Sequence, residues 1–101
     1  MGHLPSAIFC GSDVIAAILI QAAAERDIRI PNEVSVVGFC DEEFAKFLSP
    51  PLTTVRQDPF SIAAKGVDIL LNIIEEKDGP EKRKEVVPVE FVERNSVKKL
   101  N

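Results

Sequence analysis

The clearest indication of the architecture of this chain is the segment Ile30-Pro31-Asn32-Glu33-Val34-Ser35-Val36-Val37-Gly38-Phe39. Proline lacks a backbone donor and pushes the residue before it out of the helical region, so the stretch opens with a turn. The residues from Val34 to Phe39 are mainly β-branched or apolar, which is typical of a strand. Because polar residues do not alternate strictly along them, we interpret them as a strand buried within a sheet.

A further strand and a helix precede this stretch. Ala7-Ile8-Phe9-Cys10 is a short continuous apolar run, which we interpret as a strand buried on both faces. Ser12 or Asp13 caps the following helix, which is almost wholly apolar over residues 14–24 and is therefore expected to be buried on more than one side. Strand, helix and strand in close succession predict a right-handed βαβ unit, a parallel sheet and an α/β fold.

The middle of the chain predicts a short helix and another strand. Residues 41–48 make two helical turns that Pro50 ends. The apolar residues of these turns share one face and are Phe44, Phe47 and Leu48. Residues 52–56 are β-prone and predict a strand after the prolines.

A long helix and a last strand follow. Asp58 and Pro59 begin an amphipathic helix whose apolar residues recur at helical spacing. A polar loop starts at Lys77. Residues 86–93 predict a strand, and Pro88 within it places this strand at the edge of a sheet.

Composition excludes several classes of function. The chain has 101 residues, of which 46% are hydrophobic and 28% charged, enough for one modest core. A formal net charge of −4 argues against broad contact with nucleic-acid phosphates. The sequence lacks a signal peptide and the roughly 18 consecutive apolar residues of a membrane span, so we expect a cytoplasmic protein with no membrane partner. Two cysteines are too few for a Cys₄ site, and we expect no metal and no cofactor.

Four phrases follow one another along the chain. They are Ala7-Ile8-Phe9-Cys10-Gly11-Ser12-Asp13, Ile30-Pro31-Asn32-Glu33-Val34-Ser35-Val36-Val37-Gly38-Phe39, Pro50-Pro51-Leu52-Thr53-Thr54-Val55-Arg56-Gln57 and Phe91-Val92-Glu93-Arg94-Asn95-Ser96. In order and spacing they resemble the C-terminal third of LacI/GalR-type bacterial transcriptional regulators. Each phrase is a weak signal alone, but together they cover nearly the whole chain.

The resemblance implies part of a type I periplasmic-binding-protein-like fold, in which two α/β lobes joined by crossing strands hold a small effector in the cleft between them. Within residues 4–101, residues 4–57 and 85–101 would belong mainly to the C-terminal lobe. The helix over residues 58–78 would pack on the N-terminal lobe. Residues 1–3 resemble the remnant of an expression tag. No segment reads as a helix-turn-helix, so operator DNA would be contacted only through a headpiece absent from this sequence.

The resemblance and the geometry of parallel sheets select the same ligand-binding candidates. Ligands of such folds bind beyond the carboxyl ends of the strands. The candidates that follow those ends are Ser12, Cys40, Asp41 and Gln57. Ser12 would face the effector while Asp13 would cap the helix. The amide of Gln57 suits a polyol, whereas Arg56 is expected to pair with a carboxylate near the hinge.

The loop after Phe39 departs from the family. Family members usually have a ligand-binding aspartate where this sequence has Cys40, with Asp41 one position later. Either Asp41 serves instead, or the effector lacks the hydroxyl groups that a carboxylate binds and Cys40 only lines the cleft, since a thiol is a weak donor and acceptor. Reduced thiols are the default, although a disulfide with Cys10 is conceivable if the two strands are neighbours.

The resemblance also implies a homodimer. The matching surface residues are Ile15, Leu19, Phe44, Phe47 and Leu48. Ordinary core packing is the alternative for these apolar side chains, Phe44 above all.

The function that the resemblance implies is effector sensing: a sugar or nucleobase-like molecule closes the lobes and shifts a two-state dimer. A periplasmic sugar-binding protein of the same fold stays open as an alternative. An α/β enzyme would use the carboxylates of Asp41, Glu42 and Glu43. Because the sequence has no nucleophile pair, metal-ligand spacing or phosphate loop, we expect no catalytic residues.

Overall fold

The computed structural model describes residues 4–75 and 86–99, which form two compact units. The first unit comprises Met1–Arg56 and Glu90–Asn101, and the second comprises Gln57–Val89. The chain therefore leaves the first unit after Arg56 and returns to it at Glu90. The predicted remnant at residues 1–3 and the loop starting at Lys77 lie outside the described residues.

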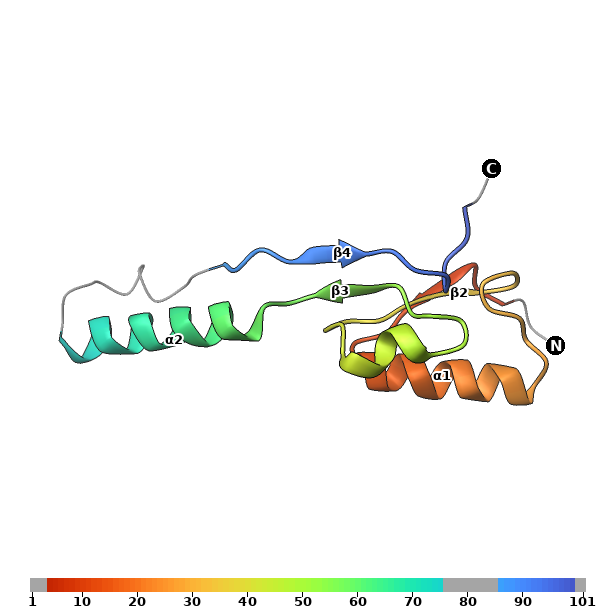
Figure 1. Cartoon of the computed structure of the whole chain (residues 1–101), viewed down its shortest axis with the longest axis horizontal. Helices are drawn as coiled ribbons and strands as arrows, with labels where there is room; N and C mark the ends of the chain where they lie inside the picture. The colour runs from red at the N-terminus through yellow and green to blue at the C-terminus, as the bar shows by residue number, and fades with distance from the viewer. Residues whose placement is uncertain (1–3, 76–85, 100–101) are drawn as a thin grey trace. The chain divides into compact units, whose positions relative to one another are not determined.

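A βαβ unit forms the centre of the first unit (Figure 1). Strands β1 (Ala7–Phe9) and β2 (Ser35–Val37) pair in parallel, with Ala7 opposite Ser35. Helix α1 (Asp13–Glu25) connects them and runs alongside the sheet. Asp27 follows the helix with a left-handed φ of 58°, as expected of an aspartate near a helix end. The predicted parallel sheet and α/β class are confirmed.

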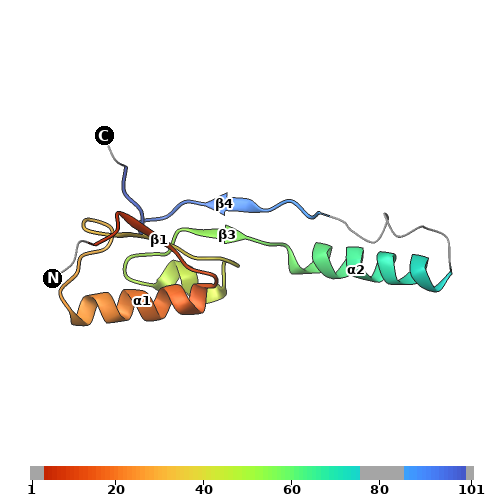
Figure 2. The same cartoon turned by 180° about the vertical axis from the view of Figure 1, so that it is seen from behind.

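Two further strands, β3 and β4, form a second two-stranded sheet, which isolated bridges join to the first (Figure 2). Parallel bridges join β2 and the loop after it to the segment of β3 (Thr54–Arg56), with the Gly38 amide donating to Thr53 O at 2.9 Å. Strand β4 (Glu90–Val92) pairs antiparallel with β3. Among the described strands β4 pairs with β3 alone, as expected of an edge strand, but it begins at Glu90, after Pro88, rather than spanning the predicted residues 86–93.

The core of the first unit lies between α1, β2 and the segment before β3. Its buried residues are Cys10, Ala16, Ile20, Val34, Val36, Ala45 and Leu52. Gly38 is required here, because a Cβ atom would come within 2.8 Å of Leu52 Cδ2 and closer still to Asp13 Oδ1. The sequence uses a glycine where the strand passes over a buried carboxylate.

Burial of β1 and α1 on several sides was predicted and is wrong for the described residues. Phe9 is 67% exposed, and Ile15 and Ile18 of α1 are 55% and 63% exposed. The reason is that, of the described strands, β2 alone pairs with β1, so apolar side chains directed away from this small core face solvent. Apolarity on all sides of an element does not say how many neighbours it has.

The segment before Pro50 is a short 3₁₀ helix, η1 (Glu43–Phe47), rather than two α-helical turns. Left-handed φ values of 112° at Cys40 and 58° at Asp41 delay its start. Leu48 packs partly against the core, whereas Phe47 is 77% exposed and has the Lys46 ammonium 5.4 Å from its ring centroid.

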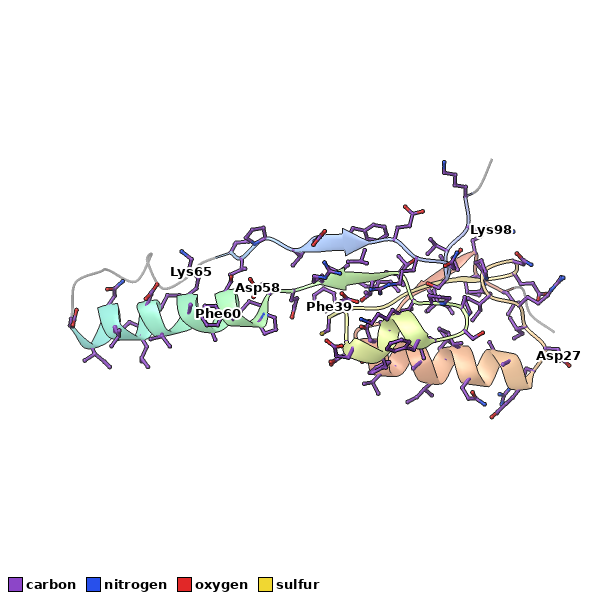
Figure 3. All side chains as sticks on the ribbon, in the orientation of Figure 1. Asp27, Phe39, Asp58, Phe60, Lys65 and Lys98 are labelled. Carbon is purple, nitrogen blue, oxygen red and sulfur yellow. The ribbon has the colours of Figure 1, made fainter. Side chains whose placement is uncertain are left out.

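The second unit contains helix α2 (Pro59–Ile74), which confirms the predicted amphipathic helix. Asp58 caps it, accepting hydrogen bonds from the Ser61 amide at 3.2 Å and the Ser61 hydroxyl at 2.7 Å, and Figure 3 shows Asp58 and Phe60 at its first turn. Its exposed large apolar residues are Phe60, Ile62, Val67, Leu70, Leu71 and Ile74. Neither α2 nor any other described helix is long and apolar enough to cross a membrane.

Candidate functional site

The carboxyl ends of β1, β2 and β3 lie at one edge of the parallel part of the sheet. Ser12 follows β1 and begins α1, Cys40 and Asp41 follow β2, and β3 ends at Arg56. The Cys40 amide donates to Val55 O at 2.8 Å, which joins the second of these ends to the third. Three of the four ligand-binding candidates, Ser12, Cys40 and Asp41, therefore belong to this edge of the first unit.

Of the two residues expected to cap α1, Ser12 does so and Asp13 does not. Ser12 Oγ accepts a hydrogen bond from the Ile15 amide at 3.2 Å and is the N-cap of α1. Asp13 is fully buried, and its Oδ1 accepts from the Thr54 hydroxyl at 2.7 Å. The prediction that Asp13 caps the helix is wrong, because its carboxylate is turned into the interior of the unit.

Asp13 holds the loop that follows β2. Its Oδ2 accepts from the Glu42 amide at 2.6 Å, and Thr54 Oγ1 in turn accepts from the Asp41 amide at 3.3 Å. The buried carboxylate is thus satisfied by donors from two segments, as buried polar groups must be. These bonds fix the backbone next to Cys40, which is held in the left-handed region of φ.

Asp41 forms two ion pairs. Its Oδ2 accepts from Arg56 Nε at 2.8 Å, and its Oδ1 accepts from Arg94 Nη2 at 2.9 Å. Arg56 also pairs with Glu90 at 3.2 Å. Partial burial alone would raise the pKa of the Asp41 carboxyl, but the hydrogen bonds and charges of the two arginines outweigh it and lower that pKa. The prediction that Arg56 pairs with a carboxylate is confirmed.

Cys40 and Cys10 are both free thiols, so the disulfide considered from the sequence is not formed. Cys10 is buried in the core, and burial raises its pKa. Cys40 is half-buried, and its pKa is raised first by desolvation and then by the negative charges of Asp13 and Glu42. The Cys40 side chain is therefore a neutral thiol at the candidate edge.

The remaining candidates fall in different surroundings. Gln57 is the first residue of the second unit and is half-buried. Of the dimer candidates, Ile15 and Phe47 are exposed, whereas Leu19 and Leu48 are half-buried and pack against the core of their own unit. Phe44 is half-buried as well.

Sequence reasoning missed two groups at this edge. Arg94 and Thr54 belong to quoted phrases, but nothing in their spacing indicated that they meet Asp41 and Asp13, respectively. Phe39 forms a tilted aromatic pair with Phe9, with ring centroids 6.4 Å apart. Among residues 4–75 and 86–99 no three side chains gather that could hold a metal ion.

Comparison with known proteins gives the family. Residues 1–97 match the model of the periplasmic binding protein-like domain. The HTH-type transcriptional repressor PurR of Vibrio atlanticus is 42% identical over 101 residues, which is all of this chain and 30% of that protein. The chain thus spans less than a third of the curated relatives it matches.

Solved structures agree with this match. The lac repressor dimer bound to operator and an anti-inducer is 28% identical, with a TM-score of 0.79 over 93% of this chain and 32% of that one. A LacI family transcriptional regulator from Lactobacillus casei with bound sucrose is 30% identical, with a TM-score of 0.72 over 92% of this chain and 34% of that one. The predicted type I fold and the resemblance to LacI-type regulators are confirmed.

Proposed function

The chain belongs to the periplasmic binding protein-like domain family, and from that premise we propose that it is the effector-binding portion of a LacI-type transcriptional regulator. The observation that carries this proposal is the edge where three strands end, with Cys40 and Asp41 on a loop that a buried carboxylate holds in place. A preformed loop binds without first ordering its backbone, so it suits a site for a small molecule.

The proposed effector is a neutral molecule that bears hydroxyl or amide groups, such as a sugar or a nucleobase. Both cationic groups at this edge, Arg56 and Arg94, already pair with carboxylates, and the thiol of Cys40 is neutral. The ligand-binding residues that we propose are Ser12, Cys40, Asp41 and Gln57. The bound sucrose of the Lactobacillus casei regulator supports this class of ligand.

The proposed response is a change in the angle between two lobes. The chain leaves its first unit after Arg56 and returns to it at Glu90, and the proposed hinge is at these two crossings. An effector that binds the closed state more tightly would shift the population towards it. In the complete regulator this shift would alter operator binding through a separate DNA-binding headpiece.

The proposed homodimer would use apolar residues of α1 and η1. Val14, Ile15 and Ile18 are each at least half exposed, and Phe47 is more exposed still. Exposed apolar groups of this kind mark sites of association. Lac repressor, a structural neighbour, was solved as a dimer. A regulator that reaches operator DNA would act in the cytoplasm, and it would have no enzymatic activity.

The experiment that tests this function uses the complete protein that the gene encodes. Isothermal titration against a panel of mono- and disaccharides, including sucrose, and of purine and pyrimidine bases should give at least one saturable ligand. That ligand should change the affinity for DNA from the gene's own upstream region in a mobility-shift assay. Binding without any effect on DNA would favour the periplasmic sugar-binding protein instead, and no saturable ligand would contradict the proposal.

A further inference from the structure

One carboxylate contacts both segments by which the chain crosses between its units. Arg56 is the last residue of β3, after which the chain leaves the first unit, and Arg94 follows β4, by which it returns. Asp41 accepts a hydrogen bond from each arginine, through a different oxygen. The loop after β2 is thereby tied to the outgoing and the returning strand by a single side chain.

The ion pair of Asp41 with Arg94 is held more firmly than its ion pair with Arg56. The side chains of Asp41 and Arg94 are only 11% and 17% exposed. Arg94 also donates from Nη1 to Leu52 O at 2.8 Å, and its amide donates to Thr53 Oγ1 at 2.8 Å. A planar guanidinium that donates in several directions has a defined orientation, unlike the exposed ion pairs that contribute little.

The loop needs such support because its backbone is strained. Cys40 and Asp41 are consecutive residues other than glycine with φ of 112° and 58°. Conformations of this kind persist only where the surroundings enforce them. The contacts that enforce this one are the ion pairs of Asp41 and the hydrogen bonds that Asp13 accepts.

We propose that Asp41 is a positioning residue, which clamps Arg56 and Arg94 to the loop after β2 and so fixes the orientation of Cys40 toward the effector. The proposal rests on the effector-binding function argued above and deepens it. The effector-facing group of this loop is then Cys40, and the carboxylate next to it couples the loop to both crossing strands. A change in the angle of those strands would move Cys40 through this clamp.

The test follows alkylation of Cys40 by iodoacetamide, which requires no effector. The intact chain is labelled at neutral pH, and the peptides that contain Cys40 and Cys10 are quantified by mass spectrometry. In Asp41→Asn and in Arg94→Met, the rate at Cys40 should rise at least threefold, because loss of either partner frees the loop. The rate at buried Cys10 should stay the same, since the core is unchanged.

Electrostatics alone predicts a different pattern. Removing the negative charge of Asp41 would favour the reactive Cys40 thiolate, but removing the positive charge of Arg94 would disfavour it. A rise in Arg94→Met is therefore the informative result. When Asp41→Asn and Arg94→Met are combined, the alkylation rate at Cys40 should not exceed that of the faster single variant. Each substitution alone already removes the contact between Asp41 and Arg94, so the second one adds nothing.

Controls separate the clamp from general loosening. Glu33→Gln removes a carboxylate that pairs with Arg29 elsewhere in the same unit and should leave the Cys40 rate unchanged. If Arg94→Met fails to fold, the milder change Arg94→Lys takes its place. Its Cys40 alkylation rate should then lie above that of the original chain, by a smaller factor. An unchanged or lower rate in the Arg94 variants, multiplicative effects in the double variant, or an equal rise at Cys10 would overturn the proposal. Failure to find an effector would leave these rates as they are and would count against the proposed function alone.

Discussion

Asp13 Oδ2 accepts a hydrogen bond from the backbone amide of Glu42 at 2.6 Å, across 29 positions of the sequence. This bond joins the first turn of α1 to the loop after β2, and the Thr54 hydroxyl joins β3 to the other oxygen of the same carboxylate. The edge of the sheet that bears Ser12, Cys40 and Asp41 is therefore held together by the buried Asp13 carboxylate, which the effector does not need to contact.

Replacing Asp13 by Ala should lower the free energy of unfolding by about 1–3 kcal/mol, because the Glu42 amide and the Thr54 hydroxyl would lose their acceptor. Asp13→Asn keeps one acceptor and should cost less. Urea unfolding followed by circular dichroism measures both. Asp68→Ala, at an exposed position of α2, serves as the control for the loss of an aspartate. Equal stability of Asp13→Ala and the original chain would show that the buried contacts contribute nothing.

Gly38→Ala should also destabilise the first unit, by about 1–3 kcal/mol, because the added methyl group has no room between Leu52 and Asp13. Gly66→Ala is the matched control. A Cβ atom at Gly66 meets nothing within 4 Å, and alanine favours the interior of α2 by up to about 1 kcal/mol. The midpoint of thermal unfolding should thus fall in Gly38→Ala and rise in Gly66→Ala. A Gly38→Ala chain with an unchanged midpoint would refute the tight packing.

The ion pairs of Asp41 should make stability depend on pH at the acidic end. The pKa of Asp41 is lowered from 3.8 in the folded chain, so the unfolded state binds the proton more tightly. The stabilisation is present above the unfolded pKa of 3.8 and is lost as the pH falls through the lower folded pKa. The free energy of unfolding, measured with urea, should therefore fall less steeply in Asp41→Asn than in the original chain between about pH 5 and pH 2. The same decrease in both proteins would contradict this role of Asp41.

The local signals in the sequence predicted the elements well. The βαβ unit, the capped helix after Asp58 and the edge strand after Pro88 each follow from residues within a few positions. Burial was predicted less well, since the exposure of Phe9 and Ile15 depends on neighbours that the sequence of an element cannot specify.

The sheet edge at which three of the candidate residues lie was predicted, but the contacts among them were not. The rule about strand ends found Ser12, Cys40 and Asp41, because it depends only on topology. The contact of Asp41 with Arg94 spans 53 positions and depends on how β4 returns to β3, which no local pattern encodes. Whether Ser12 or Asp13 caps α1 depends on which of two adjacent side chains faces inward, and both residue types are good caps.

Association of the regulator should depend on the exposed side of α1. Ile15→Lys places a charge on a side chain that is 55% exposed and should weaken the proposed homodimer at least tenfold, measured by analytical ultracentrifugation over a range of concentrations. Asn32→Lys adds the same charge at an exposed turn of the same unit and should leave the dissociation constant unchanged. Equal behaviour of the two variants would place the interface elsewhere.

Gln57 should contribute directly to effector binding. In the complete regulator, Gln57→Ala should weaken the affinity for the effector by about 1–3 kcal/mol, the effect of one or two lost hydrogen bonds, when measured by isothermal titration. Gln21→Ala removes the same amide from the exposed surface of α1 and is the matched control. If Gln57→Ala and Gln21→Ala bind the effector equally well, Gln57 is outside the site and the effector is held by the loop after β2 without it.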